Sequence, residues 1–265
     1  MSESLKLYLN SASRRRINLC LILHNAFGVP EHQWPRERDR AVALLKEPGY
    51  QTVCGGRPLV YAFDVKFGGA FPAARFAEFL RAARQAGVDP YCVYMGWDPA
   101  HDFDRAAPLG FAAVSHYAAS GAETAFAQLV QQVETRYWAK AAAARNPYVP
   151  LVTTGWDKRP RKENPVSWER DHGYHRQMVF PSTAAPDEIA GHLNRALAFV
   201  REHPAICPAN TVIVYAWNEH DEGGWLCPTW TPGGPPNKER LEAIGGVLNP
   251  RHPDEIKHRG KGLQP

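Results

Sequence analysis

Short apolar runs alternate with amphipathic helical stretches along this chain, and this alternation limits the fold more than any other feature. Such runs are typical of buried strands, and helices between them are typical of βα units with a parallel sheet. Six runs qualify as strands, namely residues 17–24, 58–64, 91–97, 111–117, 149–155 and 211–219. The sequence therefore predicts an α/β fold.

The stretches between these runs carry helix signals. Ser120 and Glu123 have the spacing of a capping box, and apolar residues follow at helical spacing over 126–137. Pro186 and two acids after it are typical of a helix start. Further helices are expected over residues 5–10, 36–46, 71–86 and 237–248.

This order of elements is typical of a (β/α)8-type TIM barrel, which closes with eight strands. Only six βα units can be counted, and a helix without a preceding strand opens the chain. Either two strands escape this count or the chain lacks its first two βα units. Because every other interval is filled, we expect residues 1–248 to form a barrel domain that lacks these two units. From Asn249 onwards Pro, Lys, Arg and His dominate, so residues 249–265 are expected to form a disordered tail.

The composition excludes several classes of protein. The chain has 265 residues, 44% of them hydrophobic, which suffices for one large core. A net charge of +4 without a basic stripe argues against a nucleic-acid partner. Five widely spaced cysteines without a C-x-x-C pair argue against a disulfide framework or a zinc knuckle. No apolar run approaches the ~20 residues that span a bilayer, and no signal peptide is recognisable. We expect a soluble, cytoplasmic protein without a membrane partner, and the sequence leaves the oligomeric state undetermined.

Polar and aromatic residues gather where the predicted strands end. Such residues at the carboxyl ends of parallel strands are what a barrel active site requires. They are His24-Asn25, Asp64 with Lys66, Trp97-Asp98, His116-Tyr117, Trp156-Asp157 and the segment from Trp217 to Glu222.

The densest of these strand ends is residues 217–224, WNEHDEGG, which directly follow the apolar run TVIVYA. Glu219, Asp221 and Glu222 bring three like charges together, which raises the pKa of at least one of them. The two glycines then allow the backbone to turn. This pattern indicates an acid/base centre.

Residues 215–229, YAWNEHDEGGWLCPT, resemble the AWNEW-x-EG-x-x-x-P strand end of the WbsX-like proteins. Those proteins are named as glycosyltransferases of polysaccharide biosynthesis, but they share the barrel of glycoside hydrolase family 99. The turn Gly155-Trp156-Asp157 with Arg159 and Arg161, and residues 19–25 and 48–58, are similar too. The similarity spans about residues 17 to 248 and implies two more βα units before Ile17. The chain departs from the common pattern at His220, where an aromatic is usual, and at Asp221, which is often alanine.

Cleavage of a glycosidic bond needs one protonated carboxyl and a second, ionised one. We assign Glu219 at the strand end as the general acid/base. Asp221, Glu222 and, from the preceding predicted strand, Asp157 are candidates for the second carboxylate. The alternative for Glu219 is a structural ion pair with an arginine such as Arg159.

Aromatic and polar residues at the strand ends are candidates for binding sugar. Tryptophan and tyrosine rings offer flat faces for stacking, although such rings also serve as core. Asn218 would bind a sugar hydroxyl or satisfy loop backbone. Arg159 and Arg161 would bind an acidic sugar, neutralise Asp157 or lie in a solvated loop. The candidate substrate-binding residues are Asn25, Trp97, His116, Tyr117, Trp156, Arg159, Trp217, Asn218 and Trp225.

No metal or cofactor is expected. His24, His116 and His220 fall at strand ends, but neither H-x-H nor H-E-x-x-H occurs. A phosphate-cradling glycine loop is also missing from the sequence, which argues against nucleotide-sugar transfer. The expected function is a glycoside hydrolase that acts on a poly- or oligosaccharide. The alternatives are a non-catalytic carbohydrate-binding barrel and a polysaccharide-biosynthesis glycosyltransferase.

Overall fold

The computed structural model describes residues 3–24, 26–63, 72–120, 125–167 and 180–249. The chain divides into two compact units, which we describe separately. Unit 1 consists of Met1–Tyr117, Tyr137–Val149 and His203–Thr211, and unit 2 consists of Ala118–Arg136, Pro150–Glu202 and Val212–Pro265.

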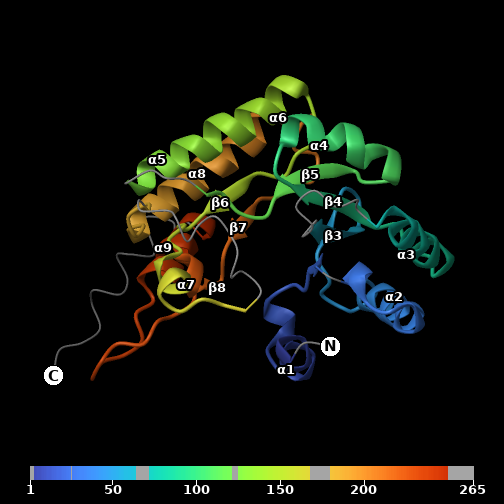
Figure 1. The fold of residues 1–265 in the computed structure, drawn as a ribbon, viewed down its shortest axis with the longest axis horizontal. Helices are drawn as coiled ribbons and strands as arrows, with labels where there is room; N and C mark the ends of the chain where they lie inside the picture. Colours follow the sequence, from blue (N-terminus) through green and yellow to red (C-terminus); the bar gives the residue numbers. More distant parts are fainter. Residues whose placement is uncertain (1–2, 25, 64–71, 121–124, 168–179, 250–265) are drawn as a thin grey trace, which may run out of the picture. The chain divides into compact units, whose positions relative to one another are not determined.

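Unit 1 is built on a parallel sheet (Figure 1). Its strands are β1 (Leu21–Leu23), β3 (Arg57–Phe63), β4 (Tyr91–Gly96) and β5 (Ala113–His116), in the order β1-β3-β4-β5. β2 (Thr52–Val53) pairs antiparallel with β3. Every residue of β4 and β5 is buried, as expected for apolar strands covered on both faces. The predicted α/β fold with a parallel sheet is confirmed.

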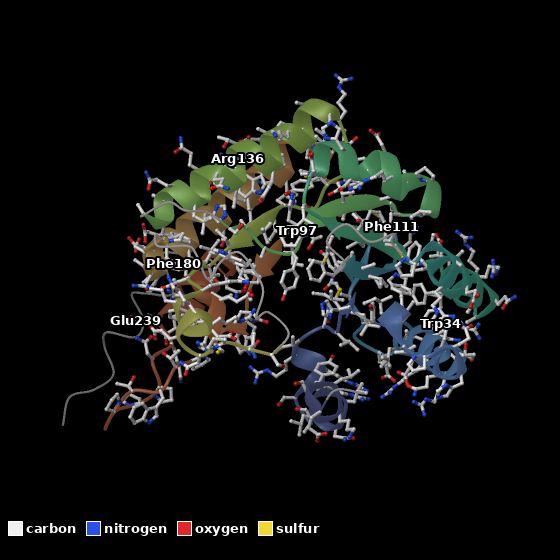
Figure 2. The ribbon with its side chains drawn as sticks, viewed as in Figure 1. Trp34, Trp97, Phe111, Arg136, Phe180 and Glu239 are labelled. Carbon is white, nitrogen blue, oxygen red and sulfur yellow. The ribbon has the colours of Figure 1, made fainter. Side chains whose placement is uncertain are left out.

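The helices of unit 1 are α1 (Glu3–Asn10), α2 (Trp34–Leu44), α3 (Ala73–Gln85), α4 (Pro99–Ala106) and α6 (Ala139–Ala144). α2 and α3 lie side by side, and the Trp34 indole of α2 donates a hydrogen bond to Glu78 of α3 (Figures 1 and 2). α3 buries Phe76, whose ring stacks on Phe111 with centroids 4.1 Å apart. These aromatic contacts fix the helix layer against the sheet.

Unit 2 contains two short strand pairs. β6 (Leu151–Thr153) and β7 (Ile213–Tyr215) are parallel, and β8 (Asn218–Glu219) and β9 (Gly224–Trp225) are antiparallel. Its helices are α5 (Phe126–Val133), α7 (Arg159–Glu163), α8 (Pro186–Glu202) and α9 (Glu239–Leu248). α8 packs on β6 and on α9, and α5 runs beside α8 (Figure 1). Among the helices of the described part of the chain, none is long and apolar enough to cross a membrane.

The predicted elements are present with shifted bounds. All six predicted strands occur, but the run 211–219 divides into β7 and β8. α5 begins at Phe126 instead of just after Ser120, and Glu123 of the predicted capping box lies outside the described residues. The closed barrel, the absence of two βα units and the domain over 1–248 stay predictions. Of the predicted tail, residues 250–265 lie outside the described residues.

Candidate active site

The acidic residues of unit 2 lie on a tight hairpin. Asn218 of β8 pairs with Trp225 of β9, and Glu219 pairs with Gly224. Between the two strands a 3-10 turn, His220–Glu222, ends at Gly223, whose φ of 76° is the left-handed conformation that glycine adopts freely. Because the ladder is only two residues long on each side, the acids are concentrated at one turn. We call Glu219, Asp221 and Glu222 the acidic cluster.

The corner that follows β6 touches this hairpin through its backbone. The Asp157 N–H donates to the carbonyl oxygen of Glu222 at 2.7 Å. A Cβ atom at Gly223 would lie 2.4 Å from the Asp157 nitrogen, and one at Gly155 would lie 2.1 Å from the Gly223 carbonyl oxygen. The two segments approach this closely only because both positions are glycine. The structure thus brings Asp157 next to the acidic cluster.

Arg161 of α7 joins the three acids of the cluster. Its Nε donates to Asp221 Oδ2 at 2.8 Å, its Nη1 donates to Glu222 Oε1, and its Nη2 lies 3.5 Å from Glu219 Oε2. Arg161 is buried.

Arg159, the arginine suggested from the sequence as a partner for Glu219, instead forms a bidentate pair with Asp157. Its guanidinium also lies 5.9 Å from the ring of Phe180, which Figure 2 labels.

Glu222 is the most enclosed member of the acidic cluster. Its side chain is 7% exposed, and Lys158 Nζ lies 3.0 Å from Oε1. The Tyr215 hydroxyl donates to Oε2. Lys158 also lies over the Trp156 ring, 4.7 Å from its centroid. Two cations, Lys158 and Arg161, lie at Oε1, and the Tyr215 hydroxyl lies at Oε2. These contacts compensate the cost of burying this carboxyl group.

Glu219 and Asp221 are more open, and their pKa values move in opposite directions. Burial raises the pKa of Glu219, the charges of Glu222 and Asp221 raise it further, and Arg161 only partly offsets this. Burial alone would also raise the pKa of Asp221, but the hydrogen bond and charge of Arg161 outweigh it and lower that pKa. Glu219 has 32% of its side chain exposed and Asp221 has 45%. The cluster therefore sets an accessible carboxyl of raised pKa beside a carboxyl of lowered pKa.

Asp157 belongs to the ionised side of this arrangement. Burial would raise its pKa, but hydrogen bonds from the Arg159 side chain and backbone outweigh this, so the pKa is lowered. As a second catalytic carboxylate, Asp157 would first have to loosen its bidentate pair with Arg159.

The tryptophans near the hairpin differ in how much ring they present. Trp217 is 54% exposed, and Asn218 beside it is exposed too. Trp156 is buried against Tyr215. Trp225 has the Arg240 guanidinium 3.6 Å from its ring centroid, with His220 5.5 Å away. Trp217 offers an open face, and sugar contacts by Trp156 and Trp225 stay predictions.

Other predicted sugar-binding residues belong to unit 1 and form an aromatic group at its strand ends. Tyr117 stacks on Phe63 with centroids 4.2 Å apart, and Trp97, labelled in Figure 2, lies 6.0 Å from Phe63. His24 stacks on Phe63 as well, at 5.3 Å. The structure brings Trp97 and Tyr117 together as expected from the strand ends. Phe63, the last residue of β3, was not singled out from the sequence, although its position at a strand end was the available signal.

His116 has a different environment from the other strand-end residues. It is fully buried, its ring stacks on Tyr137 at 3.7 Å, and Nδ1 lies 3.2 Å from the Tyr148 hydroxyl oxygen. Burial lowers the pKa of His116 to about 3, so the imidazole is neutral. Substrate contact by His116 stays a prediction. Asn25, Asp64 and Lys66 lie outside the described residues.

The remaining histidine at a strand end, His220, is exposed, and its Nε2 lies 3.3 Å from Cys227 Sγ. Within the described ranges, no group of three or more His, Cys, Asp or Glu side chains is placed to hold a metal ion.

Sequence reasoning missed the specific roles of three side chains at this site. Lys158 and Arg161 stand in the basic run 158–162, which favours a solvated loop, and the apolar pattern around Tyr215 predicts only a strand. The available signal was the i, i+3 spacing of Lys158 and Arg161, which places both on one face of a helical turn. α7 presents that face to the 3-10 turn of the hairpin.

No family model matches this chain, and no curated protein matches its sequence. Its fold is similar to a structure of the GH99 endo-alpha-mannosidase from Bacteroides thetaiotaomicron, with a TM-score of 0.52 and 14% identity over 97% of this chain and 71% of that one. A structure of that enzyme in complex with bis-tris-propane gives a TM-score of 0.51 and 13% identity, over 93% and 73% of the two chains. The chain therefore has a GH99-like α/β fold with a parallel sheet.

Proposed function

We propose that this protein is a glycoside hydrolase that cleaves a glycosidic bond in a poly- or oligosaccharide, with Glu219 as the general acid/base. The observation that carries the proposal is the state of Glu219. It is partly open to solvent, its pKa is raised, and ionised carboxylates lie beside it. A protonated carboxyl next to an ionised one is the pair of groups that this reaction requires.

The first candidates for the second carboxylate are the other two acids of the acidic cluster. Asp221 is the more exposed candidate, and Glu222 is the neighbour whose charge raises the pKa of Glu219 most. Asp221→Asn and Glu222→Gln separate these roles. Loss of turnover in only one variant identifies the partner, and Asp157→Asn tests the remaining candidate.

The choice of substrate follows the structural likeness. Two solved structures with a similar fold are of an endo-alpha-mannosidase, so we propose α-linked manno-oligosaccharides as the first substrates. The resemblance of residues 215–229 to the WbsX-like proteins adds longer polysaccharides to the panel.

The test is a reducing-end assay on the wild type and on Glu219→Gln. The change removes the transferable proton but keeps nearly the same shape, so we expect hydrolysis to fall by a factor of about 10² or more while the unfolding midpoint is no lower than that of the wild type. Arg36→Gln, an exposed change on α2, is the matched control and should retain turnover. Full turnover in Glu219→Gln would exclude Glu219 as the acid. Glycan affinity without released reducing ends in the wild type would instead favour a carbohydrate-binding protein, and affinity for a sugar nucleotide would favour a glycosyltransferase.

A further inference from the structure

Arg161 makes unequal contacts with the three acids of the cluster. Two of its N–H groups form close hydrogen bonds to Asp221 and Glu222, whereas Nη2 only approaches Glu219 at 3.5 Å. The guanidinium is a rigid planar fork, so it cannot turn toward Glu219 without loosening the other two contacts. Arg161 thus hydrogen-bonds two of the acids and lies at a longer distance from the third, Glu219.

We propose that Arg161 is a positioning residue, which orients Asp221 and Glu222 and thereby makes Glu219 bind a proton more readily than Asp221. The inference rests on the function proposed above, because it concerns the acid of that reaction. Arg161 acts through these carboxylates, and no contact between Arg161 and substrate is required.

The other charges around the cluster support this division. Lys158 lies 3.0 Å from Glu222 Oε1 and the Tyr215 hydroxyl donates to Oε2, so Glu222 is held by α7 and β7 together. Glu219 faces the same cations at longer range. Among the residues that the structure describes, the titratable groups that act on Glu219 are Glu222, Asp221, Arg161 and Lys158, with His220 next to it in the chain.

Two substitutions separate the charge of Arg161 from its shape. Arg161→Gln removes the cation and the fork. Arg161→Lys keeps a cation but replaces the fork by a single point donor, which cannot serve Asp221 and Glu222 in the same geometry. Arg159→Gln is the matched control, because it removes the same charge from the same helix while its partner is Asp157.

The test follows the side-chain carboxyl signals of ¹³C-labelled Asp and Glu by NMR from pH 3 to 8, with Glu219 and Asp221 assigned from Glu219→Gln and Asp221→Asn. In the wild type, Glu219 should take up its proton at higher pH than Asp221. In Arg161→Gln, the midpoint for Asp221 should rise by about one pH unit or more, and Asp221 and Glu219 should titrate as a coupled pair. The Asp221 midpoint in Arg161→Lys should lie between those of the wild type and Arg161→Gln. Arg159→Gln should leave the midpoints of both Asp221 and Glu219 unchanged.

Unchanged Asp221 and Glu219 midpoints in Arg161→Gln would overturn the proposal. If that variant fails to fold in circular dichroism, Arg161→Lys carries the same test, because it keeps a cation against Glu222. The titration needs no turnover, so it tests Arg161 independently of the hydrolase activity. A wild type that cleaves no glycan would contradict the proposed hydrolase function without deciding the role of Arg161. Where turnover is present, Arg161→Gln should change the pH profile of kcat with little change in KM, which a purely structural role would not do.

Discussion

The backbone N–H of Asp157 donates a hydrogen bond to the carbonyl oxygen of Glu222, with 2.7 Å between nitrogen and oxygen. This bond joins two segments more than sixty residues apart in the chain, the corner after β6 and the acidic hairpin after β7. Side-chain pairs then form on both sides of it, Asp157 with Arg159 and the acidic cluster with Arg161. The backbone contact thus holds Asp157 beside the acidic cluster.

Gly223→Ala should lower the free energy of unfolding by more than the backbone strain of a positive φ accounts for, because the new side chain also disrupts this contact. A side chain at the φ of 76° costs about 1 kcal/mol, and the new Cβ would also lie 2.4 Å from the Asp157 nitrogen. Gly233→Ala is the control, because Gly233 has a φ of 67° with open space around it. Urea unfolding should show a loss of about 1 kcal/mol for Gly233→Ala and a clearly larger one for Gly223→Ala. Equal losses would mean that the hairpin can move away from Asp157 freely.

Glu219→Gln should stabilise the protein at neutral pH. Because the folded state raises the pKa of Glu219, its contribution to stability is present at acid pH and is lost as the pH rises through the folded pKa. Glutamine mimics the protonated form, so the variant should have the higher free energy of unfolding at pH 7 and match the wild type at acid pH. Denaturant titrations at both pH values check this, and a destabilised variant at pH 7 would show that Glu219 is a net stabilising charge.

Asp157→Asn should lower the free energy of unfolding at neutral pH, which is the opposite of the effect expected for Glu219→Gln. The folded state lowers the pKa of Asp157, so its contribution is present above the ordinary value and is lost as the pH falls through the lowered one. We expect a loss of up to about 1 kcal/mol at pH 7, since the pair with Arg159 is partly exposed, and a vanishing difference at low pH. Thermal or urea unfolding at the two pH values measures it. A difference that does not depend on pH would point to the hydrogen bonds instead of the charge.

His116 should make the protein sensitive to acid. Burial lowers its pKa to about 3 in the folded state, so protons bind the unfolded chain first and stability falls as the pH drops below the ordinary value of 6.5. His116→Phe should flatten this dependence between pH 6.5 and pH 4, whereas His32→Gln, which removes an exposed imidazole, should not. The free energy of unfolding measured across that range decides between them. An identical slope in His116→Phe and the wild type would show that other groups cause the acid sensitivity.

Arg240→Gln should destabilise unit 2. The guanidinium donates to the carbonyl oxygens of Thr154, Trp225 and Ala184 and covers the Trp225 ring, and it is buried. Leaving buried carbonyls without donors costs roughly 3 kcal/mol. Arg195→Gln, which breaks an exposed pair with Glu134, should lose at most about 1 kcal/mol. A similar loss of unfolding free energy in both variants would show that the buried carbonyls find other donors.

Much of the fold could be predicted from the periodicity of the chain. The runs at 58–64 and 91–97 correspond closely to β3 and β4, because continuous apolar residues bounded by turns have few alternatives to a buried strand. The run 211–219 was read as one strand, but the ladder of β7 ends at Tyr215 and a separate hairpin begins at Asn218. Local propensity does not distinguish the two, since the partner that ends a strand comes from elsewhere in the chain.

The concentration of acids after Ala216, and the need to compensate their charge, are properties of the sequence alone. Which acid keeps its proton is decided by the tertiary structure. Arg161, about sixty residues upstream, hydrogen-bonds Asp221 and Glu222 and leaves Glu219 at a longer distance, whereas Arg159, two residues away in the chain, pairs with Asp157. Charge interactions depend on distance and burial, and these were set only when α7 packed against the hairpin.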